Sequence, residues 1–357
     1  MVLAALAVHG RTSPQASAPP APSTPSPAVT KPALPQLNAG LNTGRSLLGL
    51  GRRELESALD DIAGAGFTWI RVDFSWTDIQ PVSKDSYTWG PTDRVVRAAR
   101  AHDLDVLGLI SYTPAWARRA GCRDFTCPPA STPAFADFAG EVADRYVSRG
   151  VGTYQLWNEP NLDLFWQQPD PVAYGDLVRR AATALRRGHD GVRVVFGSMV
   201  VRDRDADGVD PAVFVRAACK RGCPVDAVGF DPYTFPDLPS ATGKRSAWAT
   251  ISRGGVVRRT IDQSIGADVP VWVTQFGAPV TEKTVHPPYV DVDRQSEIIM
   301  AGLRLARQDQ LIGGFFVNSW RDAPSSSDYR DHFGLWGADG TARPAVASLR
   351  KALSRQP

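Results

Sequence analysis

The chain has 357 residues, of which 43% are hydrophobic and 22% are charged, as in soluble globular proteins. This length allows one large domain or two ordinary ones. The net charge of +3 comes from 40 basic and 37 acidic side chains that are well mixed, and no basic run is interleaved with aromatic residues, so we expect no nucleic-acid partner.

The first part of the chain predicts export followed by a linker. Residues 1–10 contain a short apolar run, VLAALAV, which fits the end of a secretory signal, although no Lys or Arg precedes it; an ordinary floppy N-terminus is the alternative. Neither this run nor any later one is long enough to span a bilayer. Residues 11–36 are rich in Pro, Ala, Ser and Thr and predict a disordered linker. We expect one folded domain over residues 37–357.

From residue 37 onward, short apolar runs alternate with amphipathic helical patterns. Thr132 and Pro133 predict a helix N-cap and first helical residue, and Asp170 with Pro171 repeats that signal before a helix that Gly188 ends. The runs predict strands, of which the first carries the weakest signal, around 37–42 and over 67–74, 104–111, 151–158, 192–199, 225–233, 270–276 and 311–320.

The predicted strands are apolar at nearly every position, which is typical of a parallel sheet covered by helices on both faces. About eight alternations of strand and helix over roughly 320 residues predict the α/β class and a (β/α)8 TIM barrel. A doubly wound sheet is the alternative. It usually has a glycine-rich phosphate turn after its first strand, and residues 40–45 match neither form of that turn.

The four cysteines form two close pairs, Cys122 with Cys127 and Cys219 with Cys223. Each pair is able to close a small disulfide loop, which favours a secreted or cell-surface protein. A zinc site built from both pairs is less favoured, because the spacings are not CxxC and the five histidines are scattered. Four reduced thiols are the third alternative.

In a barrel, functional side chains lie where the strands run into the following loops. Any one of the residues there could have a purely structural role, in core packing or in an ion pair. Together they predict a carbohydrate site, because Trp rings stack on sugars and because amides and carboxylates form hydrogen bonds with hydroxyls. The expected set is Arg71, Asp73, Trp76, Tyr112, Trp116, Trp157, Asn158, Glu159, Asp231, Tyr233, Gln275, Asn318, Trp320, Arg321 and Asp322.

The densest of these segments, WNEPN at residues 157–161, resembles a motif of the retaining glycoside hydrolases of clan A. The resemblance runs along the barrel from about residue 37 and is nearest to family 39, the xylosidase and iduronidase group, and to related bacterial exopolysaccharide hydrolases. NLDLFW at 161–166, FGAP at 276–279 and FGLW at 333–336 add to it.

The resemblance implies a role for several residues. Glu159 would be the general acid/base, and Asn158 would bind the hydroxyl beside the reacting carbon. Arg71 and Tyr233 would hold the nucleophile, and Trp320 would form the floor of the first sugar subsite. The remaining substrate-binding candidates are Asp73, Trp76, Trp116 and Asp231.

The resemblance also implies the chemistry. One carboxyl group is kept neutral to protonate the leaving oxygen, and a second, about 5 Å away, attacks as a carboxylate. No cofactor or metal is therefore expected. We expect a poly- or oligosaccharide substrate and a monomeric protein.

The chain departs from the family at Gln275, where the nucleophile is a Glu. An amide does not readily form a glycosyl ester, so we expect hydrolysis by double displacement to be slow or absent. Three explanations are open: an engineered change, a natural binding protein, or an active enzyme whose base lies elsewhere.

Asp231 also departs from the family pattern, because the hydrolases that the chain resembles often have His at this position. An inverting route would need a second carboxylate about 6.5–9.5 Å from the acid, and Asp231 or Asp73 could supply it. Alternatively, Asp231 only bonds a loop or pairs with Arg71.

Overall fold

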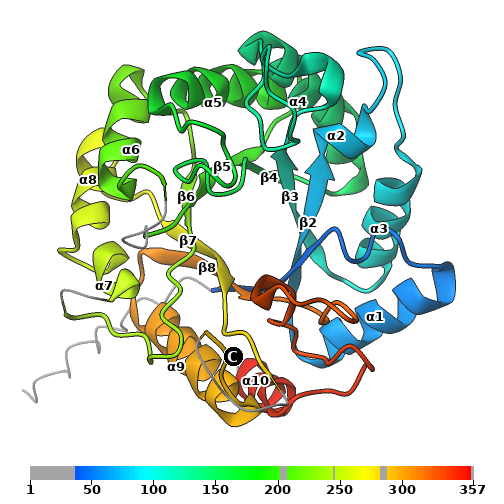
Figure 1. Ribbon diagram of the computed structural model, residues 1–357, viewed down its shortest axis with the longest axis vertical. Helices are drawn as coiled ribbons and strands as arrows, with labels where there is room; N and C mark the ends of the chain where they lie inside the picture. Colours follow the sequence, from blue (N-terminus) through cyan, green and yellow to red (C-terminus); the bar gives the residue numbers. More distant parts are fainter. Residues whose placement is uncertain (1–36, 202–206, 244–245, 282–287, 355–357) are drawn as a thin grey trace, which may run out of the picture. The chain divides into compact units, whose positions relative to one another are not determined.

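The computed structural model describes residues 37–201, 207–243, 246–281 and 288–354. The predicted export signal and linker over residues 1–36 lie outside these ranges. Eight parallel strands form a closed barrel in chain order, with helices around the outside (Figure 1). The predicted (β/α)8 barrel is therefore confirmed.

All eight predicted strands are present, including the weakly signalled first one. Each pairs in parallel with the next, and the last closes on the first through pairs such as Asn42 with Asn318. The strands are β1 (Asn38–Gly44), β2 (Trp69–Ser75), β3 (Asp105–Ser111), β4 (Thr153–Leu156), β5 (Arg193–Met199), β6 (Ala227–Phe230), β7 (Val271–Phe276) and β8 (Ile312–Asn318).

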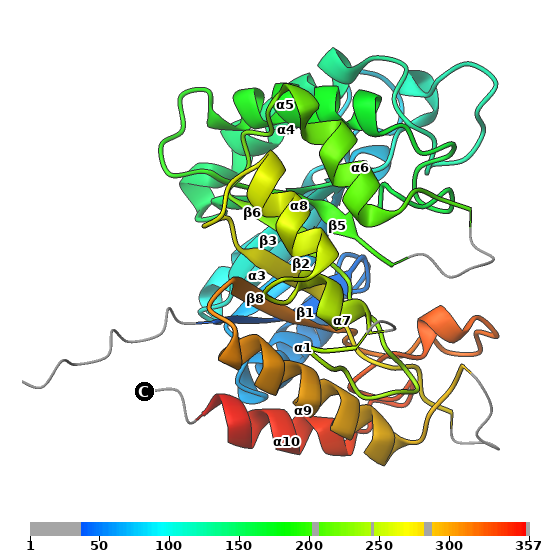
Figure 2. The same cartoon turned by 90° about the vertical axis from the view of Figure 1, so that its left-hand side faces the viewer.

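The helices of the described ranges cover the barrel, and α9 and α10 lie side by side in both views (Figures 1 and 2). They are α1 (Arg52–Gly64), α2 (Trp76–Ile79), α3 (Gly90–Ala101), α4 (Thr132–Tyr146), α5 (Pro171–Arg186), α6 (Pro211–Ala218), α7 (Ala247–Ile251), α8 (Val256–Ser264), α9 (Val292–Gln308) and α10 (Pro344–Leu353).

The two predicted helix starts differ in outcome. Asp170 caps α5 as expected, since its carboxylate accepts from the first backbone N–H groups of the helix. The cap of α4 is Ser131 rather than Thr132, because Ser131 accepts from the N–H of Ala134. The hydroxyl of Thr132 instead donates to Asp176 on the neighbouring helix at 2.5 Å.

An apolar plug fills the barrel at the amino ends of its strands. Trp69 meets Trp272 edge-on with ring centroids 5.6 Å apart, and Trp272 stacks on Phe316 at 5.9 Å. The guanidinium of Arg193 lies over both Trp rings. A Cβ at Gly40 would lie 2.3 Å from the Phe316 ring, so this close approach requires glycine. The plug closes one end of the barrel and leaves the other for a site.

Two disulfides are present, Cys122–Cys127 and Cys219–Cys223. The predicted pairing is confirmed, and the zinc and free-thiol alternatives are excluded. Among the described residues, no helix is both long and apolar enough to cross a membrane.

Candidate functional site

A pocket of about 440 Å³ opens at the carboxyl ends of the strands. Nine of the residues expected at the mouth line it. They come from β2, β7 and β8 and from the loops that follow β3, β4 and β6: Arg71, Asp73, Tyr112, Asn158, Glu159, Asp231, Tyr233, Gln275 and Asn318.

Arg71 is the buried centre of the pocket floor. Its Nε donates to Gln155 Oε1, its Nη1 to Asn42 Oδ1 and its Nη2 to Asn158 Oδ1, each at 2.8 Å. All three acceptors are neutral amides. They fix the guanidinium in place, but the negative charge that balances it must come from elsewhere.

Gln275 lies beside this centre, and its amide has a defined orientation. Its Oε1 accepts from Asn42 at 3.1 Å. Its Nε2 donates to Asn158 Oδ1 at 3.0 Å and to Asp231 Oδ2 at 2.9 Å. A neutral amide of β7 thus contacts β1 and the loops after β4 and β6 at the position that the resemblance gives to the nucleophile.

An irregularity in β7 brings two successive side chains to the same carboxylate. Thr274 donates to Asp231 Oδ1 at 2.6 Å, and Gln275 donates to the other oxygen. Regular strands send successive side chains to opposite faces. The register of β7 against β8 shifts between Val273 and Phe276, and such a shift re-aims a side chain. Asp231 therefore accepts from both residues.

Asp231 and Glu159 form a buried pair of carboxyl groups joined by a hydrogen bond. Burial raises the pKa of Glu159 well above its usual range, and the charge of Asp231 raises it further. Burial also raises the pKa of Asp231, whereas the charge of Arg71 and hydrogen bonds from Thr274 and Ser198 lower it. Asp231 is therefore the ionised partner, and Glu159 holds the proton.

The turn after β4 presents Glu159 through strained backbone. Trp157 has φ 72° and Glu159 has φ 42°, in the left-handed region that residues other than glycine seldom adopt. The turn is held on both sides: Trp157 Nε1 donates to Phe165 O at 2.7 Å, and the hydroxyl of Tyr174 donates to Leu156 O at 2.6 Å. Strain of this kind is often found where side chains are positioned for function.

Aromatic rings form two walls of the pocket. On one side, Phe333 packs against Tyr233 and Phe235 with centroids 5.5 and 5.4 Å away. On the other, Tyr112 packs edge-on against Phe125, which belongs to the loop that the first disulfide closes. These rings provide flat apolar surfaces of the kind on which a sugar ring packs.

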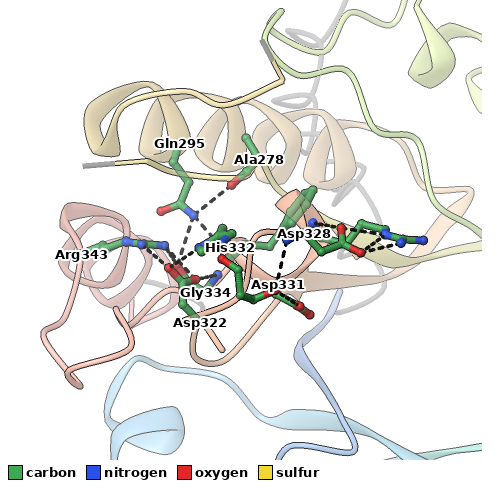
Figure 3. Close-up of polar contacts among 11 residues, drawn as sticks. Ala278, Gln295, Asp322, Asp328, Asp331, His332, Gly334 and Arg343 are labelled. Atoms are coloured by element: carbon green, nitrogen blue, oxygen red, sulfur yellow. Dashed lines mark hydrogen bonds and ion pairs between the residues drawn. The ribbon is translucent and has the colours of Figure 1, made fainter. Parts of the chain in front are cut away.

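The loop that follows β8 supplies one of these walls and is braced from behind (Figure 3). Asp322 pairs with Arg343 at 2.5 Å, and both side chains are buried. Asp322 also accepts from the N–H of Gly334 at 2.7 Å. From α9, Gln295 donates to the carbonyls of Ala278 and Gly334. These contacts fix the loop that carries Tyr329, Arg330 and Phe333 into the pocket.

The expected tryptophans lie elsewhere. Trp76 is fully buried and stacks on Phe138 of α4, since it begins the short helix that covers this side of the barrel. Trp116 donates its Nε1 proton to Gln80 O. Trp320 is buried beside the guanidinium of Arg321. The described lining of the pocket includes none of these three tryptophans, so their expected contact with sugar stays a prediction.

Three more of the residues expected at the mouth are structural in this arrangement. Trp157 packs against Trp166 in the core, Arg321 lies on Trp320, and Asp322 braces the β8 loop. Of the residues at the end of β8, Asn318 lines the pocket, and the role of Trp320 as the floor of a sugar subsite stays a prediction.

The most important residues that the sequence analysis missed are Asn42 and Gln155. Both bond Arg71, and each lies on the barrel-facing side of its strand. Asn42 follows from alternation along β1, but that strand had the weakest signal. In the described ranges, no group of three or more His, Cys, Asp and Glu side chains is arranged to hold a metal ion.

A scan against models of protein families gives no match, and neither does a search of curated proteins. Solved structures do match. A family 39 glycoside hydrolase from Bacteroides cellulosilyticus is 18% identical with a TM-score of 0.67; the match covers 89% of this chain and 63% of that one. This chain therefore spans less than two thirds of that protein's length.

Two further matches have similar scores. A monomeric beta-xylosidase from Caulobacter crescentus is 19% identical, has a TM-score of 0.66, and matches over 90% of this chain and 68% of its own. A GH5_18 protein from Streptomyces cattleya, solved with GlcNAc, is 20% identical, has a TM-score of 0.66, and matches over 90% of this chain and 81% of its own. The chain shares the barrel fold of these proteins.

Proposed function

We propose that this protein is a barrel of glycoside hydrolase type that binds a poly- or oligosaccharide in the pocket, and that Gln275 disables its hydrolysis by double displacement. The observation that carries the proposal is the amide of Gln275, which stands between Asn158 and Asp231 where the resemblance places a carboxylate. The folds of a family 39 hydrolase and a beta-xylosidase support the class.

The pocket retains the acid half of the chemistry. Glu159 is buried and protonated beside Asp231, which is the state needed to protonate a glycosidic oxygen. The attacking carboxylate of the retaining mechanism is missing at Gln275, so no glycosyl ester forms there. The negative charge near Arg71 resides on Asp231 instead. A carboxylate that follows β6 thus takes the place of the carboxylate that the resemblance expects on β7.

An inverting reaction through Asp231 is disfavoured by the geometry. Inverting pairs stand about 6.5–9.5 Å apart, with a water between them and the sugar. Asp231 and Glu159 are hydrogen-bonded, which leaves no room for that water. Hydrogen bonds from Thr274 and Gln275 occupy the same carboxylate. We assign Asp231 as a positioning residue that holds the proton of Glu159.

We further propose that the protein is monomeric and works outside the cell or on its surface, since both disulfides are stable only in an oxidising compartment. The export signal over residues 1–10 and the linker over residues 11–36 stay predictions.

The test restores the missing carboxylate. Gln275→Glu alone would place a second carboxylate against Asp231 Oδ2, at the present 2.9 Å contact, and like charges this close share a proton. We therefore expect little activity from Gln275→Glu and at least about tenfold more from Gln275→Glu with Asp231→Asn, because only the double variant carries an ionised nucleophile. Release of aryl groups from α- and β-glycosides, xylosides and arabinosides included, measures it.

Two controls accompany this test. Adding Glu159→Gln to the double variant should abolish release, because the leaving group then has no acid. Calorimetric titration of the unaltered protein should show sugar binding without release. Turnover by the unaltered protein that equals the double variant's would show that the two-step assignment is wrong. Absence of both binding and restored turnover would contradict the proposed function.

A further inference from the structure

Asp73 is a carboxyl group of the pocket that the proposed chemistry does not use. It lies two residues after Arg71 on β2, on the same barrel-facing side, and only 7% of it is exposed. It lines the pocket, and no hydrogen bond joins it to another residue of the described ranges. Its oxygens are not among the fully buried unpaired atoms of the described residues, so they meet the solvent of the pocket, where the donor of a ligand would replace water.

Among the described residues, the two cations that act on Asp73 are engaged with other residues. Arg71 donates from Nε, Nη1 and Nη2 to amide oxygens, and Arg45 pairs with Asp78 at 2.9 Å. Burial raises the pKa of Asp73, and the charges of Arg71 and Arg45 lower it only from a distance. The acceptor capacity of Asp73 therefore remains open toward the pocket.

The charges around the pocket leave an excess of negative charge. Arg330 at the rim pairs with Asp328, as Arg45 does with Asp78. Among the described residues that line the pocket, the unpaired charges are then the guanidinium of Arg71 against the carboxylates of Asp73 and Asp231, while Glu159 carries a proton. This described part of the lining is negative even though the whole chain has a net charge of +3.

A ligand that satisfies Asp73 must bring a donor, and the charge decides which kind. A sugar hydroxyl offers a neutral hydrogen bond, whereas an ammonium group offers a charge-assisted bond roughly twice as strong and neutralises the excess charge. The ring of Tyr112 also lines the pocket, and the charge of Asp73 adds to the effect of burial in raising the pKa of Tyr112. Aromatic faces attract cations as well.

We propose that the pocket takes a saccharide containing an amino sugar with a free, protonated amine, which donates to the carboxylate of Asp73. The proposal rests on the proposed function, because it names the substrate class of the same pocket. It distinguishes a de-N-acetylated hexosamine from the N-acetylated and plain hexose forms, which carry no charge at that position.

The test is a comparison of three oligosaccharides of equal length by calorimetric titration, near pH 6 and at low salt. They are a β-1,4-glucosamine oligomer, its fully N-acetylated form and a cello-oligosaccharide. The variant is Asp73→Asn. The matched control is Asp103→Asn, which removes an exposed carboxylate just before β3, at the opposite end of the barrel. Asp103 has φ 55°, which Asn tolerates.

We expect the unaltered protein to bind the glucosamine oligomer at least about tenfold more tightly than the two neutral sugars, which is about 1.4 kcal/mol. Asp73→Asn should remove most of this preference, whereas Asp103→Asn should leave it unchanged. Because the net charge of the protein is positive, general attraction to a cationic sugar does not explain such a preference.

The other outcomes separate the two proposals. Equal binding of all three sugars by the unaltered protein, which needs no variant to be folded, overturns the amino-sugar inference and leaves the proposed function standing. A preference that survives in Asp73→Asn overturns the role of Asp73. Failure to bind any of the three sugars counts against both proposals, and turnover by the nucleophile-restored double variant then decides whether the proposed function survives.

Discussion

Glu159 and Asp231 show how one side chain at the end of a strand, the neutral amide of Gln275, affects its neighbours. With an amide at 275, the only residue of the pair able to balance Arg71 is Asp231, and its charge together with burial keeps Glu159 protonated. The protonation of Glu159 therefore depends on Arg71 of β2, Asp231 after β6 and Gln275 of β7 as well as on the WNEPN segment itself.

This protonation predicts a pH dependence of stability. The pKa of Glu159 is raised in the folded state, so the folded protein binds more protons than the unfolded chain above the ordinary Glu pKa of about 4.3. The stabilisation is complete below that pH and is lost as pH rises through the raised pKa. Glu159→Gln does not titrate there, so unfolding free energies from urea titration should show the unaltered protein losing stability relative to Glu159→Gln as pH rises from about 4.

The control for this experiment is Glu141→Gln, since Glu141 is exposed on α4. Its stability relative to the unaltered protein should stay nearly constant over the same pH range. If Glu159→Gln shows the same flat difference, Glu159 is ionised in the folded protein, and its assignment as the proton holder is wrong.

At this scale, the sequence predicted which residues stand at the strand ends but not how they contact one another. The positions of Glu159 and Gln275 at the pocket followed from the motif and from the strand pattern. The contact of both Thr274 and Gln275 with Asp231 depends on the shift in β7, and an unbroken apolar run carries no signal for such a shift.

The loop after β8 shows the role of a braced element. Asp322 and Arg343 are nearly fully buried as a pair, and removing one partner of a buried pair leaves an uncompensated charge. We expect Asp322→Ala to lower the free energy of unfolding by about 3–5 kcal/mol and to weaken sugar binding, because the loop carries Phe333 into the pocket. Urea unfolding and calorimetric titration measure the two effects.

Asp328→Ala in the same loop is the matched control. Asp328 pairs with Arg330, but both side chains are well exposed, and exposed pairs contribute about 0–1 kcal/mol. A loss of stability in Asp328→Ala as large as that in Asp322→Ala would contradict the bracing role of the buried pair.

How well each strand or helix could be predicted depends on which of its faces are buried. The strands are covered on both faces, so their apolar runs identified all eight. The sequence does not distinguish the positions of the tryptophans, because a Trp next to a strand end is equally able to cover the barrel or to stack on a sugar. Trp76 took the first role, since α4 offers Phe135 and Phe138 for its ring.

At the scale of the whole molecule, the two disulfides lie at opposite ends of the barrel. Cys122–Cys127 belongs to the loop after β3, on the pocket side, where Phe125 packs on Tyr112. Cys219–Cys223 lies between α6 and β6, at the amino ends of the strands. We therefore expect the first disulfide to affect both the pocket and stability, and the second to affect stability alone.

We expect replacement of either bridge by two serines to lower the free energy of unfolding by about 2 kcal/mol, as loops this short allow. Only the change at Cys122 and Cys127 should also weaken sugar binding, because it releases the loop behind Tyr112. Chemical denaturation and titration of both double variants test this. Equal effects of the two on binding would show that the first loop does not shape the pocket.

The face opposite the pocket is where the barrel is closed. Arg350 on α10 donates to Gly64 O at the end of α1, and Leu353 packs so closely on Gly66 that a Cβ there would lie 2.8 Å from it. β1 begins on the same face. A protein attached to a sensor chip through an exposed residue of this face, such as Asp103, would present its pocket outward, so that even a long, rigid polymer could reach it.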